Sequence, residues 1–326
     1  MTLLHVGYYK TASTWLEQRL FTAPPFHQPW ERIPFAETVI DPADWDFDPD
    51  EARARLAALA RPAPAQTGAA GAAPGAPGTQ AFPVAVLSHE RLSGSPHAGG
   101  YDAPRLAERL AALFPDARVL VVVREQRAHV LSCYRQYVRE GGATSLRRYL
   151  EPPRASRWDM PALEAGFFCY DRLVARYQEL FGPERVCVLA YEQLRADPVA
   201  FAAAVCGHAG VAAPPAVPTD VVNPGLCGAT LACKRWVNWV AFRDRLNPAA
   251  PIDSPRLRYG IREAFRALDR RLPARLRAAS DRRLERTVAA WAAGRFSASN
   301  RRLAELTGLP LAHLGYDVGD SGAPAG

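Results

Sequence analysis

The sequence has 326 residues, a formal net charge of +7 at pH 7 and a hydrophobic share of 48%, enough for a sizeable core. This length fits one large α/β domain with additions, and no apolar stretch reaches the roughly 20 residues of a membrane span. No signal-peptide pattern opens the chain, and the six cysteines form neither a CxxC pair nor a zinc spacing with histidine. We therefore expect a single cytoplasmic domain over 1–326, with core thiols and no metal.

The first two thirds of the chain alternate predicted strands and predicted helices. Buried apolar runs predict strands at 2–7, 84–88, 118–123 and 185–190. The run at 118–123 is apolar on both faces, as a central parallel strand is. Helices are predicted over 14–21, with Ser13 or Thr14 as the N-cap, and over 126–139. This alternation predicts an α/β fold with a doubly wound parallel sheet flanked by helices.

Two segments stand outside this predicted core. Residues 62–83 consist largely of Pro, Gly and Ala, which cannot bury enough surface to become ordered. They are predicted to form a flexible low-complexity insert. Residues 317–326 are predicted to form a disordered tail.

From about residue 225 the chain becomes helical and rich in arginine. Residues 256–302 hold 14 Arg against four acidic residues, a charge of +10, so the rest of the chain carries about −3. Solvated helix faces explain this composition, and so does a wall that attracts an anionic ligand. No interleaved aromatic residues and no binding motif accompany the arginines, so a nucleic-acid surface is not favoured.

A group of anion-binding residues follows the first predicted strand. In VGYYKTASTWL the strand ends at Gly7 and a helix begins near Ser13, which directs free backbone N–H groups and the positive helix end at one point. Lys10, one of only two lysines in the chain, adds a charge. The hydroxyls of Thr11, Ser13 and Thr14 add donors. This set predicts an anion with several oxygens, and the missing GxxxxGK[ST] spacing disfavours ATP hydrolysis.

A second candidate anion site follows the strand at 118–123. That strand delivers Arg124 at its carboxyl end, the edge at which open α/β sheets bind ligands. Ser132 lies eight residues further along, about two helical turns into the next helix. Arginine suits bidentate contacts to phosphate. A salt-bridged arginine with a capping or buried serine is the structural alternative.

Together the two motifs resemble the cofactor-binding motifs of sulfotransferases that use 3′-phosphoadenosine 5′-phosphosulfate (PAPS). YKTASTWL is similar to the 5′-phosphosulfate loop of that family, usually written KTGTTWL, and VVVREQRAHVLSCY to its 3′-phosphate motif. The resemblance continues in LAYEQL, VNPGL and SASNRRLAELTGLPLAHLGY. It implies the P-loop-NTPase-like sulfotransferase fold with a helical C-terminal region. Ala12 stands where the family usually has glycine, and the RKGxxG motif of animal enzymes has no clear counterpart.

The resemblance also implies roles for individual residues. The loop around Lys10 would hold the 5′-phosphosulfate, Arg124 with Ser132 would hold the 3′-phosphate, and Trp15 would pack near the adenine. The residues assigned to this cofactor site are Lys10, Thr11, Ala12, Ser13, Thr14, Trp15, Arg124 and Ser132. Lys234 and Arg235 are further candidates for the same site.

Sulfuryl transfer needs a base for the acceptor and charge stabilisation on the moving group and the leaving phosphate. Lys10 is placed for the stabilisation, in the role that metals play in phosphoryl transfer, so no metal is required. The base is expected in LSHERLSG, where many bacterial and glycan sulfotransferases have a glutamate. Glu90 is the expected base, because a carboxylate with an ordinary pKa of ~4.3 is ionised at neutral pH, and His89 is the alternative. The structural alternative is that Glu90 forms an ion pair with Arg91 or with the basic C-terminal helices and shapes the site without accepting a proton.

Other notable residues are expected to be structural. His5, inside the first strand, is expected to satisfy a core hydrogen bond. Tyr191 and Glu192 are expected to orient the phosphosulfate loop, and Trp236 and Trp239, at helical spacing, to lie in the core.

The predicted function is therefore sulfuryl transfer from PAPS to a hydroxyl or amine of a small-molecule or glycan acceptor. A small-molecule kinase with the same phosphate loop is the alternative, disfavoured by the missing GK[ST] glycine and by the Arg124–Ser132 pair. A third interpretation is an inactive nucleotide-binding protein. The presence of Lys10 and Glu90 disfavours it. No nucleic-acid partner and no membrane span are expected. The basic C-terminal segment favours an acidic acceptor, although the fold itself does not identify one.

Overall fold

The protein is an α/β protein built on one parallel sheet. The structure, a computed structural model, describes residues 1–22, 24–62, 84–95, 99–151, 163–214, 216–218, 225–241, 251–252 and 255–319. These residues form a five-stranded sheet of order β2–β3–β1–β4–β5, in which every neighbouring pair is parallel. The strands are β1 (Thr2–Gly7), β2 (Phe26–His27), β3 (Val84–His89), β4 (Arg118–Val123) and β5 (Val186–Ala190).

The four longer strands confirm the strands predicted from the apolar runs, and the parallel α/β fold is confirmed. The short edge strand β2 was not predicted, because two residues carry no periodicity. Register brings the carboxyl ends of the central strands to one edge: Val6 of β1 lies beside His89 of β3, and Gly7 lies beside Val122 of β4. Loops that follow these three strands therefore meet at the same edge of the sheet.

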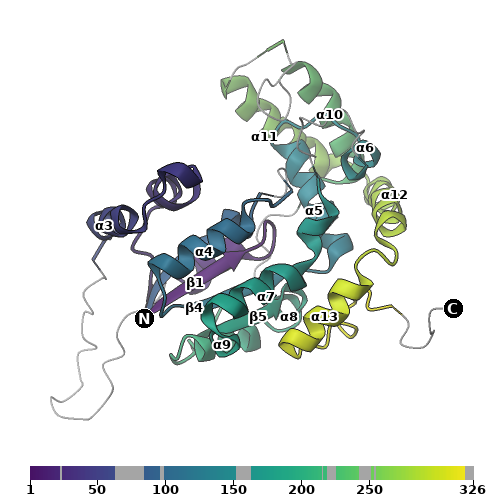
Figure 1. The fold of residues 1–326 in the computed structure, drawn as a ribbon. Coiled ribbons are helices and arrows are strands. Elements are labelled where there is room, and N and C mark those ends of the chain that lie inside the picture. The colour runs from purple at the N-terminus through teal and green to yellow at the C-terminus, as the bar shows by residue number, and fades with distance from the viewer. Residues whose placement is uncertain are drawn as a thin grey trace.

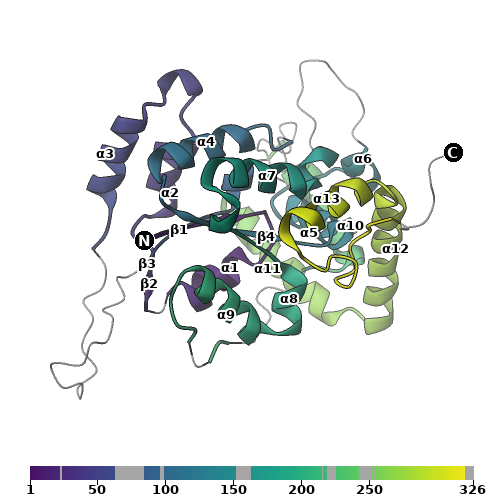
Figure 2. The ribbon, with the colours of Figure 1, turned by 60° about the horizontal axis from the view of Figure 1, so that its bottom comes forward.

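Helices cover both faces of the sheet (Figures 1 and 2). The α-helices are α1 (Ser13–Trp15), α2 (Arg32–Phe35), α3 (Pro49–Leu59), α4 (Ala103–Leu113), α5 (Gln126–Arg139), α6 (Leu146–Leu150), α7 (Tyr170–Phe181), α8 (Tyr191–Ala196), α9 (Pro198–His208), α10 (Gly228–Ala241), α11 (Pro255–Arg271), α12 (Ala274–Ala292) and α13 (Ser297–Thr307). The π-helical segments are η1 (Leu16–Leu20) and η2 (Ala36–Ile40), and the 3₁₀ helices are η3 (Asp44–Asp46), η4 (Glu90–Ser93), η6 (Ala165–Phe168) and η7 (Pro183–Arg185).

Two apolar cores lie on the two faces of the sheet. Alternate strand residues face opposite sides, so Leu4 and Val121 join one core and Leu3 and Leu120 the other. The first core packs under α2, α4, α5, α7 and α13. The second packs under α1, η1 and α9, which lie on the opposite side of the sheet in Figure 2. The sheet is thus buried on both faces, which explains its continuous apolar strands.

The C-terminal helices extend the fold beyond the carboxyl edge of the sheet. Helices α10 and α12 both pack against α5, the helix that follows β4, and α10 also packs against α11. Figure 1 shows α10, α11 and α12 gathered around α5, away from α3 and α9. The arginine-rich part of the sequence is therefore placed beside the edge at which the strand-end loops meet.

Three details differ from the predictions. Trp236 and Trp239 were expected in the core but are 71% and 62% exposed, because helical spacing puts them on one face of α10 without saying which face is buried. All six cysteines are unpaired, and Cys233 is exposed rather than a core thiol. Residues 317–319 of the predicted tail are placed by Asp317, which accepts hydrogen bonds from Ser297 Oγ and the Gly294 N–H. Of the predicted insert over 62–83, residues 63–83 lie outside the described residues, as does the remainder of the tail.

Candidate active site

The loop between β1 and α1 has an unusual backbone. Lys10 and Ala12 both have positive φ, at 70° and 72°. Between them the Thr11 hydroxyl is fully buried and donates to the Tyr8 carbonyl at 2.6 Å. The side chain of Thr11 therefore fastens the loop from inside, while Lys10 and Ala12 line the cavity outside it.

The helix that follows this loop begins without a side-chain cap. Ser13 or Thr14 was predicted as the N-cap, but Ala12 occupies that position and makes no side-chain hydrogen bond. A helix start leaves its first N–H groups without intrahelical partners. With no hydroxyl cap in the way, these donors and the side chains of Ser13 and Thr14 face the same cavity as Lys10. This is the arrangement of an anion-binding helix N-terminus.

Ala12 predicts a measurable strain. An alanine with φ near 70° is less stable than glycine in the same conformation, by roughly 1 kcal/mol. We expect Ala12→Gly to raise the unfolding free energy by about that amount in chemical denaturation. The matched control is Ala111→Gly inside α4, where φ is not positive and the same change is expected to destabilise. A destabilised Ala12→Gly variant would contradict the strain.

Arg124 crosses from the end of β4 to the loop after β1. Its Nη1 donates to the Lys10 carbonyl at 3.1 Å, and its guanidinium lies 4.5 Å from the centre of the Tyr191 ring. Its Nε is buried without a hydrogen-bond partner among the described residues. A buried N–H of this kind costs about 1–3 kcal/mol when it stays unpaired. Arg124 is thus held from two sides, and its buried Nε–H is available to a ligand.

These groups line one cavity of about 500 Å³, which we call the phosphate cavity. It brings together seven of the eight predicted cofactor residues, all except the inward-turned Thr11. Eight basic residues line it, and no acidic one does among the residues that the structure describes. The basic residues are Lys10, Arg124, Arg135, Arg139, Arg195, Lys234, Arg262 and Arg266. Such a cavity favours a ligand with several negative charges.

Lys10 lies in a positive environment. Its Nζ donates to Gln136 Oε1 at 3.5 Å, and Gln136 in turn donates to Glu140. Burial, together with the charges of Arg139 and Arg124, lowers the pKa of Lys10 from its usual value. The surroundings of Lys10 therefore disfavour its positive charge, and a bound anion would stabilise that charge.

Trp15 and Lys234 form further parts of the wall. Trp15 is buried, donates from Nε1 to the Pro218 carbonyl at 3.1 Å and meets Phe201 edge-on. Lys234 is only 2% exposed and donates to Asn238 Oδ1 at 2.8 Å. Arg235, the other candidate in this segment, points elsewhere: it donates to the Ala143 carbonyl and does not line the phosphate cavity.

Glu90 lies at the end of the neighbouring strand β3, outside the phosphate cavity. It forms an ion pair with Arg32 of α2, and among the described residues it forms none with Arg91 or the basic helices. Arg32 also binds Glu17 of η1 at 3.0 Å. Arg91 pairs with Asp41 instead. Burial opposes ionisation of Glu90, but the hydrogen bond and charge of Arg32 outweigh it, so the pKa of Glu90 lies below its usual value. Glu90 is therefore a carboxylate at neutral pH.

The second candidate base, His89, is differently placed. It is 7% exposed, and its Nδ1 accepts the Arg91 N–H at 3.1 Å. Burial lowers the pKa of His89 to about 4, so the ring is neutral at pH 7. In a neutral ring with Nδ1 as acceptor, Nε2 carries the hydrogen and has no lone pair for a proton. The geometry favours Glu90 over His89 as a proton acceptor.

The remaining residues near the motifs have structural contacts. His5 Nδ1 lies 2.7 Å from Ser88 Oγ, which confirms the predicted core hydrogen bond. Tyr191 lines the phosphate cavity and lies against the Arg124 guanidinium, which in turn binds the Lys10 carbonyl of the loop. Glu192 accepts the Glu125 N–H at 3.1 Å and the Tyr316 hydroxyl at 3.0 Å, and so ties α8 to the start of α5 and to the C-terminal turn.

Sequence reasoning missed part of this constellation. Glu17 and Arg32 carried no motif, and only their contacts with Glu90 connect them to the site. The arginines that close the phosphate cavity, Arg135, Arg139, Arg195, Arg262 and Arg266, are hidden in a composition that is rich in arginine throughout. Among the described residues, no group of three His, Cys, Asp or Glu side chains could hold a metal ion, and no helix is long and apolar enough to cross a membrane.

The fold and site define an α/β protein with a basic cavity at the carboxyl edge of a parallel sheet. The sequence profile of the sulfotransferase family matches residues 3–215, and the chain belongs to this family. Among solved structures it is similar to a sulfotransferase from Alicyclobacillus acidocaldarius (20% identity, 68% of this chain and 85% of that one, TM-score 0.47). It is also similar to the sulfotransferase domain from the curacin biosynthetic pathway (11% identity, 89% of this chain and 96% of that one, TM-score 0.37). No curated protein matches the sequence.

Proposed function

We propose that this sulfotransferase moves a sulfuryl group from PAPS to a hydroxyl or amine of a small-molecule or glycan acceptor. The observation that carries the proposal is the phosphate cavity, in which Lys10, Arg124 and Ser132 meet further basic side chains and no described acidic one. A donor with anionic groups at both ends suits a cavity that is basic along its length. The unpaired Nε of Arg124 matches a phosphate oxygen as its acceptor.

Individual residues would hold the donor in the following way. Lys10 and the open helix start with Ser13 and Thr14 would bind the 5′-phosphosulfate, with the backbone of Thr11 and Ala12 shaping the loop. Arg124 and Ser132 would bind the 3′-phosphate, and Trp15 would pack near the adenine. The residues of this set come from the strand-end loops of β1 and β4 and from the helices that follow them.

The proposed chemistry uses few groups of the protein. When bound, PAPS supplies an activated sulfuryl group, whose bond to the phosphate oxygen breaks as the acceptor forms its bond to sulfur. The Lys10 ammonium stabilises the negative charge that develops on the leaving side. Glu90 takes the proton of the acceptor, and Arg32 keeps that carboxylate ionised beforehand. Register places Glu90 and Lys10 after adjacent parallel strands.

A thermal shift assay with adenosine 3′,5′-bisphosphate, the nucleotide product, tests the donor assignment. At about 100 times its dissociation constant a ligand adds roughly 2.7 kcal/mol of stability. We expect this stabilisation with the bisphosphate, little with AMP, and none in Arg124→Ala. The matched control is Arg127→Ala, three residues further along and outside the phosphate cavity, which should keep the response.

Two outcomes would contradict the proposal. Stabilisation by ATP with magnesium but not by the bisphosphate would favour the kinase alternative. An unchanged bisphosphate response in Arg124→Ala would place the 3′-phosphate elsewhere.

A further inference from the structure

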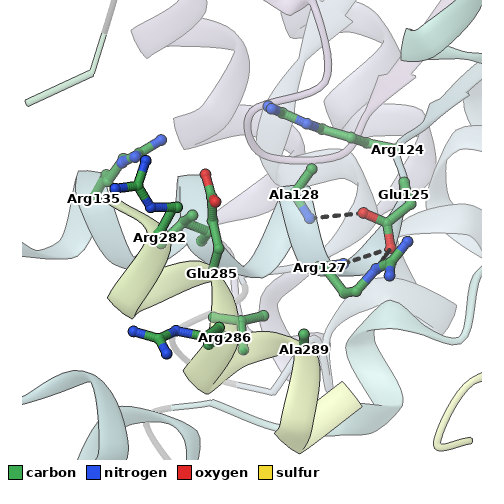
Figure 3. Close-up of a pocket in the computed structure, with 11 residues that line it drawn as sticks. Arg124, Glu125, Arg127, Ala128, Arg135, Arg282, Glu285, Arg286 and Ala289 are labelled. Atoms are coloured by element: carbon green, nitrogen blue, oxygen red, sulfur yellow. Dashed lines mark hydrogen bonds and ion pairs between the residues drawn. The ribbon is translucent and has the colours of Figure 1, made fainter. Parts of the chain in front are cut away.

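A second cavity lies beside the phosphate cavity, between α5 and α12 (Figure 3). Its volume is about 720 Å³, within the range of small-molecule sites. It shares Arg124 and Arg135 with the phosphate cavity but includes neither Lys10 nor the loop after β1. The charged residues that line it are Arg124, Glu125, Arg127, Arg135, Arg282, Glu285 and Arg286. We call it the α5/α12 cavity.

The α5/α12 cavity has an excess of positive charge. Five arginines line it against two glutamates. One of these carboxylates is already engaged, because Glu125 accepts the Arg127 Nε–H at 2.7 Å and caps the start of α5. Neither Arg282 nor Arg286 has an ion pair in the part of the chain that the structure describes. Guanidinium groups around one cavity repel each other until an anion lies between them.

Arg124 and Arg135, which line both cavities, each have a buried N–H that no described residue accepts from. Arg135 Nη2 binds Asp281 Oδ1 at 2.8 Å, but Arg135 Nε is buried without a partner among the described residues, as is Arg124 Nε. Unpaired buried N–H groups are costly, and an anion that accepts from them removes that cost.

The α5/α12 cavity also has an apolar part. Ala128 and Leu131 of α5 and Val288 and Ala289 of α12 complete its lining. An inorganic ion would leave this surface uncovered, whereas a carbon skeleton would bury it. We propose that the α5/α12 cavity binds an organic anion, an acidic group on an apolar body, while the phosphate cavity holds the nucleotide.

Isothermal titration of the full chain with 2-naphthoate, with and without adenosine 3′,5′-bisphosphate, tests the proposal. We expect 2-naphthoate to bind in both conditions and the neutral isostere 2-naphthamide to bind at least tenfold more weakly. The double variant Arg282→Gln/Arg286→Gln should weaken 2-naphthoate at least tenfold and leave the bisphosphate affinity unchanged. Glu285→Gln removes a carboxylate for which the described residues provide no ion pair, and it should strengthen the binding of 2-naphthoate.

Arg283→Gln is the matched control, since Arg283 is an exposed arginine of the same helix that does not line the cavity. Equal affinities for 2-naphthoate and 2-naphthamide, or an equal loss in Arg283→Gln, would overturn the proposal. So would a loss of bisphosphate binding in the double variant, because α12 would then belong to the nucleotide site. If the bisphosphate fails to bind but 2-naphthoate still discriminates, the proposed function falls and the anion site stands.

Activity measurements separate two sources of such an anion. If the acceptor itself carries the acidic group, a reading that rests on the proposed function, 6-hydroxy-2-naphthoate should be sulfated with a KM that rises at least tenfold in the double variant. If the anion is an effector, 2-naphthoate should change the rate with the neutral acceptor 2-naphthol in the wild type but not in the double variant. Either result supports the site.

Discussion

Lys10→Met is expected to lower kcat/KM for sulfuryl transfer by about 10²–10³-fold, the typical loss when one group that stabilises transition-state charge is removed. The same variant is expected to be more stable than the wild type, by about 0.5–2 kcal/mol. The reason is that burial and the nearby Arg139 and Arg124 lower the pKa of Lys10, so its charge opposes folding. Initial rates and chemical denaturation at pH 7 measure the two effects.

The pH dependence of this stability difference has a defined sign. A lysine with a lowered pKa in the folded state binds fewer protons there than in the unfolded chain, between its folded pKa and its usual value of 10.5. The destabilisation is therefore fully present at pH values below the folded pKa and shrinks as the pH rises through it. The advantage of Lys10→Met should narrow toward alkaline pH. In the proposed function the same charge helps to bind the nucleotide, so wild-type affinity for the bisphosphate should fall as pH rises through that pKa.

Lys10→Arg is the control for this prediction, because it keeps a positive charge that does not titrate in this range. It should retain bisphosphate binding into alkaline pH. A Lys10→Met variant with wild-type kcat/KM would remove Lys10 from the proposed chemistry. A variant less stable than the wild type would show that the hydrogen bond with Gln136 outweighs the burial of charge.

Glu90→Gln is expected to lower kcat by about 10²–10⁴-fold, the range for loss of a general base. The change keeps the size of the side chain, and Glu90 lies outside the phosphate cavity, so bisphosphate affinity should stay within a factor of about two. Pre-steady-state and steady-state rates with saturating donor, together with calorimetric binding of the bisphosphate, separate the two effects.

The neighbouring carboxylate provides the matched control. Glu17 binds the same guanidinium, but it follows the helix start rather than β3. Glu17→Gln should cost far less in kcat than Glu90→Gln. In the wild type the acid limb of kcat should lie below pH 4.5, because Arg32 holds the pKa of Glu90 down against burial. Arg32→Gln should move that limb to higher pH. A loss of less than threefold in Glu90→Gln would place the base elsewhere.

The sequence predicted the half of the site that belongs to continuous segments. Apolar runs marked β1 and β4, and the carboxyl ends of neighbouring parallel strands meet at one edge, so Lys10 and Arg124 could be expected to lie together. The predicted N-cap, Ser13 or Thr14, was wrong. A serine or threonine normally caps a helix by accepting from its first N–H groups, whereas here Ala12 is the N-cap and no side chain that the structure describes accepts from them.

The residues around Glu90 could not be predicted in the same way, although Glu90 itself was. The pairing of Arg32 with Glu90 joins residues 58 positions apart, and no local pattern encodes it. Trp236 and Trp239 illustrate the same limit, since spacing gives a shared helix face but not its neighbours. The arginines of the phosphate cavity were missed for a related reason, because in a chain rich in arginine throughout, composition does not show which arginines come together.

The strand order has a consequence for how the site forms during synthesis. Strand β1 sits at the centre of the sheet, where Thr2 pairs with Ala85 and Leu3 with Arg118. Both partners are made long after β1, so the loop that carries Lys10 lacks a strand on both sides of β1 until β4 has emerged. At 5–20 residues per second this interval is on the order of ten seconds. Closing a loop costs only ~0.6 kcal/mol more for each doubling of its length, so a longer chain between β1 and β3 would reduce the stability of the folded protein very little. It would, however, lengthen the time during synthesis for which the apolar strand β1 has no partner strand.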